Sequence, residues 1–162
     1  MAENQVQASD PLQDRAQVRI FTLADYVAEE PSGRLYISGG GLEWGGLPTF
    51  PDRLGPFDLA LRLAFPLDSS DPKGTVRDSY SVEIRALDAG GQPVGPDPML
   101  QTKMRFQRNR LPDNAREVSG NLPVRFADYP VIAKSSDIIF LQLSVDGVLI
   151  SCLPVQLRPI DE

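Results

Sequence analysis

The chain contains no histidine and a single cysteine, Cys152, among its 162 residues. Without histidine there is no imidazole general base, no Ser-His-Asp or Cys-His catalytic arrangement, and no histidine ligand for zinc or iron. One cysteine excludes a disulfide within the chain and is typical of a reducing compartment. Cys152 lies in an apolar stretch, so we expect it to be a small buried side chain. The composition therefore predicts a protein that is not an enzyme and needs no cofactor.

Long hydrophobic runs and an excess of positive charge are also missing. No apolar run approaches the roughly 20 residues that a membrane helix needs, and the polar start of the chain lacks the pattern of a secretion signal. Lysine and arginine total 16 against 22 aspartate and glutamate residues, which gives a formal net charge of −6. Binding to nucleic-acid phosphates needs clustered basic residues and is disfavoured. We expect a cytoplasmic protein that binds neither nucleic acid nor membrane.

What the chain has in quantity is short apolar stretches separated by turn residues. Fifteen prolines and thirteen glycines are dispersed between these stretches, which is typical of many short strands. Residues 57–65 alternate large apolar side chains with small or polar ones, the pattern of a half-buried strand. Asp146-Gly147 separates two apolar runs, and this dipeptide is strongly preferred in two-residue hairpin turns.

We therefore predict an all-β fold, a two-layer antiparallel β-sandwich of about eight strands with an immunoglobulin-like or C2-like layout. No amphipathic helical segment separates the strands, which disfavours an α/β fold. Residues 1–17 are polar and aperiodic and are expected to form a flexible N-terminal tail. Residues 18–160 have the length of one domain. The expected strands are 19–27, 35–38, 57–65, 79–87, 99–108, 121–126, 138–145 and 148–157.

The first expected strand, 19–27, is apolar on both faces apart from Asp25. We expect the strand to be covered on both sides and the Asp25 carboxylate to accept hydrogen bonds, because a buried charge must be paired. A hydrolase would need Asp25 to converge with a second carboxylate such as Glu43, and this is the least favoured function. The run Gly39-Gly40-Gly41 lacks the spacing of a phosphate-binding loop and predicts a bend.

Several of these features together resemble an uncharacterised bacterial domain family. The resemblance covers Val18 to Leu157 and implies a single β-sandwich with a Leu-Ala-Asp-Tyr … Gly-Gly N-terminal signature, without catalytic residues. The segments that carry it are Leu23-Ala24-Asp25-Tyr26, Gly33-Arg34-Leu35-Tyr36-Ile37, the glycines before Trp44, the Leu59–Phe65 strand and Val145-Asp146-Gly147.

A candidate interface lies on the expected strand 138–145. Its natural inward set is Ile139, Leu141, Leu143 and Val145. That alternation leaves Ile138 and Phe140 on the outer face, and two large apolar residues there indicate a covering loop or a partner protein. We therefore predict a non-catalytic protein-binding or assembly module, a structural protein that self-associates into an oligomer or docks on a protein partner.

Basic side chains gather on the expected strand 99–108, at Lys103, Arg105 and Arg108. One interpretation is a solvated strand face that prevents aggregation at a sheet edge. The other is a patch for an acidic partner, including the acidic segments of a second copy.

The alternative function is a carbohydrate- or calcium-binding β-sandwich. Tyr36 and Trp44 are possible ligand contacts, because aromatic rings stack on sugars; a lone tryptophan also commonly closes the end of a sandwich. The loop 68–71 with Asp88 or Asp97 offers oxygen ligands for calcium, but the loop alone has too few. We expect no bound metal.

Overall fold

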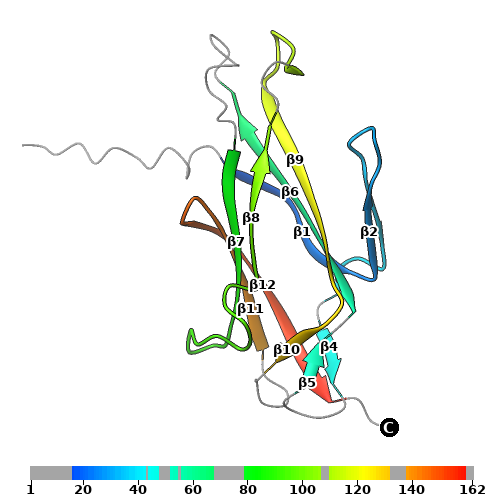
Figure 1. Ribbon diagram of the computed structural model, residues 1–162, viewed down its shortest axis with the longest axis vertical. Coiled ribbons are helices and arrows are strands. Elements are labelled where there is room, and N and C mark those ends of the chain that lie inside the picture. The colour runs from blue at the N-terminus through cyan, green and yellow to red at the C-terminus, as the bar shows by residue number, and fades with distance from the viewer. Residues whose placement is uncertain are drawn as a thin grey trace, which may run out of the picture.

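The computed structural model describes residues 16–42, 44–47, 52–54, 56–67, 79–106, 110–131 and 138–159. Every regular element in these ranges is a strand, so the predicted all-β class is confirmed (Figure 1). The strands are β1 (Gln17–Ala24), β2 (Tyr26–Glu29), β3 (Leu35–Ser38), β4 (Trp44–Leu47), β5 (Asp52–Leu54), β6 (Phe57–Pro66), β7 (Ser79–Leu87), β8 (Leu100–Arg105), β9 (Glu117–Phe126), β10 (Tyr129–Val131), β11 (Ile138–Val145) and β12 (Val148–Pro159). In this part of the chain no helix has the length and apolar character needed to cross a membrane.

The strands form two larger sheets and two strand pairs. The three-stranded sheet has the order β1-β6-β9, and the five-stranded sheet has the order β4-β12-β11-β7-β8. The pairs are β2–β3 and β5–β10. The described pairings are antiparallel except that β4 runs parallel to β12, so the described sheets are mostly antiparallel, as expected.

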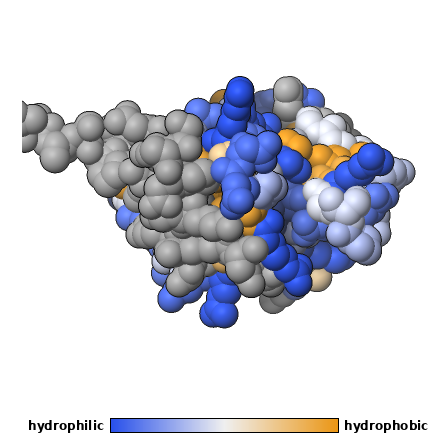
Figure 2. Space-filling view, turned by 90° about the horizontal axis from the view of Figure 1, so that it is seen from above, coloured by the Kyte–Doolittle hydropathy of each residue, from blue (hydrophilic) through white to orange (hydrophobic). Residues whose placement is uncertain are grey.

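One hydrophobic core draws side chains from both larger sheets. Phe65 of β6 stacks on Tyr80 of β7 with ring centroids 4.1 Å apart, and Phe106 meets both rings edge-on. The inward set predicted for β11 is buried, with exposed fractions of 2% or less. Figure 2 views the molecule from above the orientation of Figure 1; the described residues visible there are mainly hydrophilic, with hydrophobic residues between them.

Strand β6 is buried on both faces, which the alternating pattern did not predict. Its large side chains enter the main core, but Asp58, Ala60 and Ala64 on the opposite face are also buried. The β2–β3 hairpin covers part of that face, where Val27 packs with Ala60 in a second, small core. The small alanine side chains on this face allow the hairpin to pack closely against it. Strand β6 is therefore buried on both faces and not half-buried as predicted.

The expected first strand is divided at Asp25. Strand β1 ends at Ala24, and the backbone N–H of Asp25 donates to the carbonyl of Ser38 at 3.1 Å. Strand β2 then pairs with β3 instead of continuing along β6. The predicted glycine bend is confirmed: Gly39 and Gly41 have φ of 63° and 78°, a conformation that favours glycine.

The β11–β12 turn also follows the prediction. Asp146 and Gly147 both have positive φ, 48° and 81°, as a type I′ turn requires. The backbone N–H of Asp146 donates a hydrogen bond to the carbonyl of Ser81 on β7, and the Asp146 carboxylate accepts one from the Ser81 N–H, each at 2.8 Å. Pro154 of β12 pairs with Phe140 of β11, and β4 pairs with β12 only from Gln156 onward, so Pro154 lies on an edge of the described sheet, where proline is tolerated.

Candidate docking surfaces

The outer face of the five-stranded sheet carries a small apolar surface on β11 and β12. Ile138 is 46% exposed and Phe140 is half-buried. The register places Phe140 opposite Pro154 of β12 and Leu87 of β7. We call Ile138, Phe140 and Pro154 the apolar patch. A hollow of about 330 Å³ lies there, lined by Ile138, Leu153, Pro154 and Gln156.

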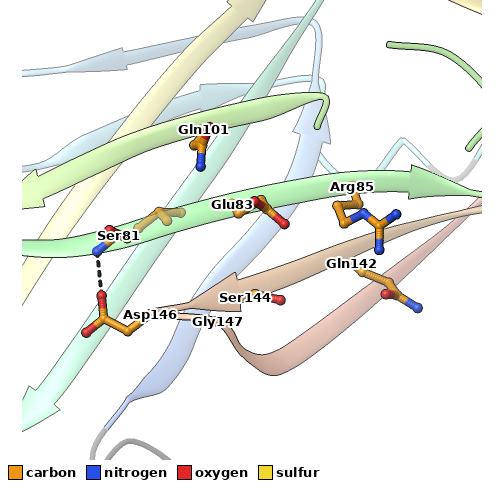
Figure 3. Close-up of a pocket in the computed structure, with 9 residues that line it drawn as sticks. Ser81, Glu83, Arg85, Gln101, Gln142, Ser144, Asp146 and Gly147 are labelled. Atoms are coloured by element: carbon orange, nitrogen blue, oxygen red, sulfur yellow. Dashed lines mark hydrogen bonds between the residues drawn. The ribbon is translucent and has the colours of Figure 1, made fainter. Parts of the chain in front are cut away.

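The middle of the same face is polar. A wider hollow of about 540 Å³ lies over β7, β8, β11 and the β11–β12 turn (Figure 3). Its polar lining consists of Ser81, Glu83, Arg85, Gln101, Gln142, Ser144 and Asp146. Hydroxyl, amide and charged groups therefore border the apolar patch along the strands.

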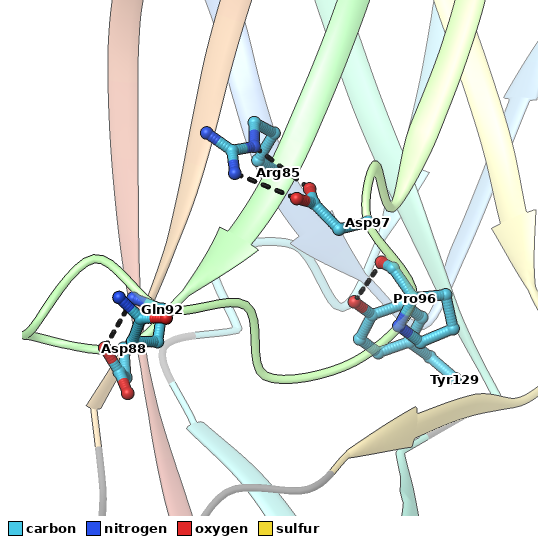
Figure 4. A network of polar contacts seen from close by, with 6 residues as sticks. All are labelled: Arg85, Asp88, Gln92, Pro96, Asp97 and Tyr129. Carbon is cyan, nitrogen blue, oxygen red and sulfur yellow. Dashed lines mark hydrogen bonds and ion pairs between the residues drawn. The ribbon is translucent and has the colours of Figure 1, made fainter.

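The loop between β7 and β8 is fixed by specific polar contacts (Figure 4). Arg85 donates two hydrogen bonds to the Asp97 carboxylate, at 3.0 and 2.8 Å. This hydrogen bonding holds the pKa of Asp97 below its usual range and raises the pKa of Arg85. The hydroxyl of Tyr129 donates to the carbonyl of Pro96 at 2.9 Å. Burial, with the negative charge of Asp97 as a smaller cause, raises the pKa of Tyr129 to about 12.

The aspartates proposed to assist a calcium loop are engaged elsewhere. Asp97 pairs with Arg85, and Asp88 accepts from the backbone N–H groups of Gly90 and Gln92 at 2.9 and 2.8 Å. Residues 68–71 lie outside the described residues. The described ranges contain no group of three or more potential metal ligands.

Two of the three predicted basic residues lie on β8, which is the terminal strand of the five-stranded sheet among the described strands. Lys103 and Arg105 of β8 are exposed on its outer face, and Met104 between them is buried. We call Lys103 and Arg105 the basic edge. Arg108 lies outside the described residues. Among the described residues, no ion pair or side-chain hydrogen bond engages the two basic-edge side chains.

Two tyrosines are exposed together on the β2–β3 hairpin. Tyr36 is 58% exposed, and Tyr26 is 49% exposed. Their ring centroids are 6.3 Å apart with the planes inclined by 63°. Trp44 lies in β4, in a different sheet, and its side chain is outside the described part of the structure. Tyr26 was expected to be covered; the interruption at Asp25 exposes it.

Among the described residues, the buried carboxylate is Asp58, not Asp25. Asp58 is 3% exposed, and its Oδ2 accepts from the backbone N–H of Val27 at 2.7 Å. Its Oδ1 accepts from Arg125 at 3.3 Å. Asp25 is exposed, so its expected role as a buried acceptor is wrong. Glu43, its proposed catalytic partner, lies outside the described residues.

Cys152 is exposed, which contradicts the expected burial. The register places it opposite Gln142, on the outer sheet face, while the adjacent Leu153 packs against the core. Neighbouring atoms partly desolvate the thiol and raise its pKa. The thiolate form is therefore disfavoured at neutral pH.

Comparison with protein-family models gave no match, and comparison with curated protein sequences gave no significant match. The resemblance of Val18 to Leu157 to a bacterial domain family therefore stays a prediction.

Proposed function

We propose that this protein is a non-catalytic assembly module that binds a second copy of itself through the apolar patch. The observation that carries the proposal is the exposure of Ile138 beside Phe140 and Pro154, on a sheet face with a hollow that Ile138 and Pro154 help to line. Exposed apolar side chains grouped in this way are typical of protein contacts. A polar surface borders them, and an apolar centre with a polar rim is the usual anatomy of an interface.

The architecture that we propose is a two-layer β-sandwich with an immunoglobulin-like or C2-like layout. Its support is the shared core, to which the three-stranded and five-stranded sheets both contribute. In such a sandwich the outer face of a sheet is a rigid surface, because cross-strand pairing fixes the position of each side chain. Two copies related by a twofold axis present the same patch to each other. We also propose a cytoplasmic setting, where the exposed thiol of Cys152 remains reduced.

Size-exclusion chromatography with light scattering tests self-association. The wild-type protein is expected to form a dimer or larger oligomer at high concentration. Phe140→Asp places a charge at the centre of the contact and is expected to return the protein to a monomer. A wild-type protein that stays strictly monomeric, and that Phe140→Asp leaves unchanged, argues against self-association and leaves docking on a different protein as the form of the proposal.

The second candidate function is the binding of carbohydrate or calcium. The exposed pair Tyr26 and Tyr36 favours it, because aromatic side chains are common sugar contacts. Because the two ring planes are inclined by 63°, a sugar would contact two angled aromatic surfaces and not one flat surface. Titrating glycans and Ca²⁺ against the fluorescence of Trp44 and the tyrosines distinguishes this candidate, and a flat response counts against it.

A further inference from the structure

A second surface points to a partner of different chemistry. Strand β8 (Leu100–Arg105) ends the five-stranded sheet and pairs with β7 on one side only, among the described strands. Alternate backbone N–H and C=O groups along the other side of such a strand are available for pairing. An extended peptide can join the sheet there, which is a common mode of peptide recognition.

The outer face of β8 selects the charge of such a peptide. Lys103 and Arg105 are exposed and, among the described residues, without an ion-pair partner. Side chains directly opposite on paired antiparallel strands have Cβ atoms about 4.5–5.5 Å apart. Carboxylates at alternate positions of the added strand therefore face the basic edge. Charges farther away than roughly 8 Å are largely screened at physiological ionic strength. Lys103 and Arg105 therefore act on a bound carboxylate more strongly than the net charge of −6 on the whole chain does.

The inner face of β8 selects apolar residues. Leu100 and Phe106 pack against the core but are only half-buried, as is Leu122 of β9. The two strands approach closely at this side, because a Cβ on Gly120 of β9 would lie 2.8 Å from the sulfur of Met104. An added strand directs every second side chain toward this side of the core. Apolar side chains at those positions would cover the half-buried residues.

We propose that the free edge of β8 binds an extended segment of another protein in which acidic and apolar residues alternate. A second copy pairing through β8 is disfavoured, because it would bring the basic edges of both copies onto one face, and like charges on opposed strands are destabilising. The proposal is independent of the apolar patch, which lies on β11 and β12. It also differs from the interpretation in which the basic residues only prevent aggregation.

Fluorescence anisotropy with labelled eight-residue peptides tests this pairing. A peptide that alternates glutamate and valine is expected to bind at least tenfold more tightly than a peptide of the same composition with its glutamates in one block. Methylating alternate backbone nitrogens on the edge that faces β8 is expected to abolish binding. If the alternating, blocked and methylated peptides bind equally, or none binds at millimolar concentration, the proposal is wrong.

Charge reversal gives the second readout. Arg105→Glu is expected to lower the affinity for the glutamate–valine peptide at least tenfold. Arg34→Glu, which reverses the charge of an exposed residue on the β2–β3 hairpin, should leave this affinity unchanged. The double variant Lys103→Glu/Arg105→Glu is expected to bind the corresponding lysine–valine peptide instead, which also shows that the variant is folded. Equal losses of peptide affinity in Arg105→Glu and Arg34→Glu would show that the acidic peptide is attracted by charge alone and not bound at β8, which would refute the proposal.

The apolar-patch variant separates the two proposals. Phe140→Asp should bind the acidic peptide as the wild-type protein does, whether or not it changes the oligomeric state. Peptide binding by a monomeric wild-type protein would refute self-association and support the β8 site. A wild-type oligomer that binds none of the peptides would support self-association and refute the β8 site.

Discussion

The carboxylate of Asp58 on β6 accepts a hydrogen bond of 2.7 Å from the backbone N–H of Val27 on β2. This bond joins the β2–β3 hairpin to the outer face of the three-stranded sheet. Asn121 of β9 supports the same attachment by donating to Glu29 and to the carbonyl of Gly33, at 3.0 and 2.8 Å. The hairpin that presents Tyr26 and Tyr36 is therefore held by polar contacts as well as by its small apolar core.

Removing the Asp58 acceptor should destabilise the protein. Asp58→Ala leaves the Val27 N–H unsatisfied in a buried position, and an unmade buried hydrogen bond costs about 1–3 kcal/mol. Asp58→Asn keeps an acceptor oxygen and should lose less. Urea unfolding measures both free energies of unfolding.

Arg125→Ala serves as the control for Asp58. Its side chain is 57% exposed, so losing this ion pair should cost no more than about 1 kcal/mol. Equal destabilisation by Asp58→Ala and Arg125→Ala would show that the ion pair, and not the bond to Val27, holds the hairpin.

Gly39→Ala should be more harmful than Gly33→Ala. Both glycines have positive φ, but a Cβ at Gly39 overlaps the Asp25 side chain, whereas nothing lies within 4 Å of one at Gly33. Left-handed backbone costs an alanine about 1–2 kcal/mol, and overpacking adds about 1–3 kcal/mol. Adding Asp25→Ala to Gly39→Ala should restore part of the stability. Thermal unfolding compares the variants; equal shifts for Gly33→Ala and Gly39→Ala would exclude the predicted overlap.

Tyr129→Phe should change how stability depends on alkaline pH. The pKa of Tyr129 in the folded protein is raised to about 12, above the value of roughly 10 for an unfolded tyrosine. The stabilisation from its protonated hydroxyl is therefore complete below about pH 10 and is lost as pH rises toward 12. Tyr129→Phe also loses the bond to Pro96, about 0.5–1.5 kcal/mol near neutral pH. Chemical unfolding from pH 8 to pH 11 should show a steeper decline for the wild-type protein; parallel curves would contradict the assignment.

Cys152 should report coverage of the outer sheet face. Its thiol is exposed and lies beside Pro154 in β12, so association through the apolar patch should protect it. The rate of maleimide labelling, measured at fixed pH with the reagent in excess, is expected to fall as protein concentration rises. In Phe140→Asp the rate should not depend on concentration. Identical behaviour of both proteins would place the contact elsewhere.

Local patterns predicted the elements whose side chains carry their own signal. The alternation in β11 placed the inward residues correctly, and Asp146-Gly147 placed the turn, because both depend on nearest neighbours along the chain. The outward position of Ile138 followed from the same alternation.

The remaining features depend on contacts between distant segments. The division at Asp25 requires the Ser38 carbonyl, and the burial of Asp58 requires the hairpin that covers it. Asp58 looked like an ordinary outward residue, because its neighbours alternate. Cys152 was misplaced since an apolar stretch does not reveal which of its faces the sheet leaves open.

Sedimentation equilibrium over a wide concentration range determines whether the protein self-associates through the apolar patch. We expect a concentration-dependent oligomer for the wild-type protein and a monomer for Phe140→Asp. Leu149→Asp changes another exposed apolar residue of β12, 55% exposed and outside the patch, and is predicted to associate as the wild-type protein does. A wild-type protein that is monomeric at every concentration, or an oligomer that Phe140→Asp leaves intact, would show that the apolar patch does not mediate self-association.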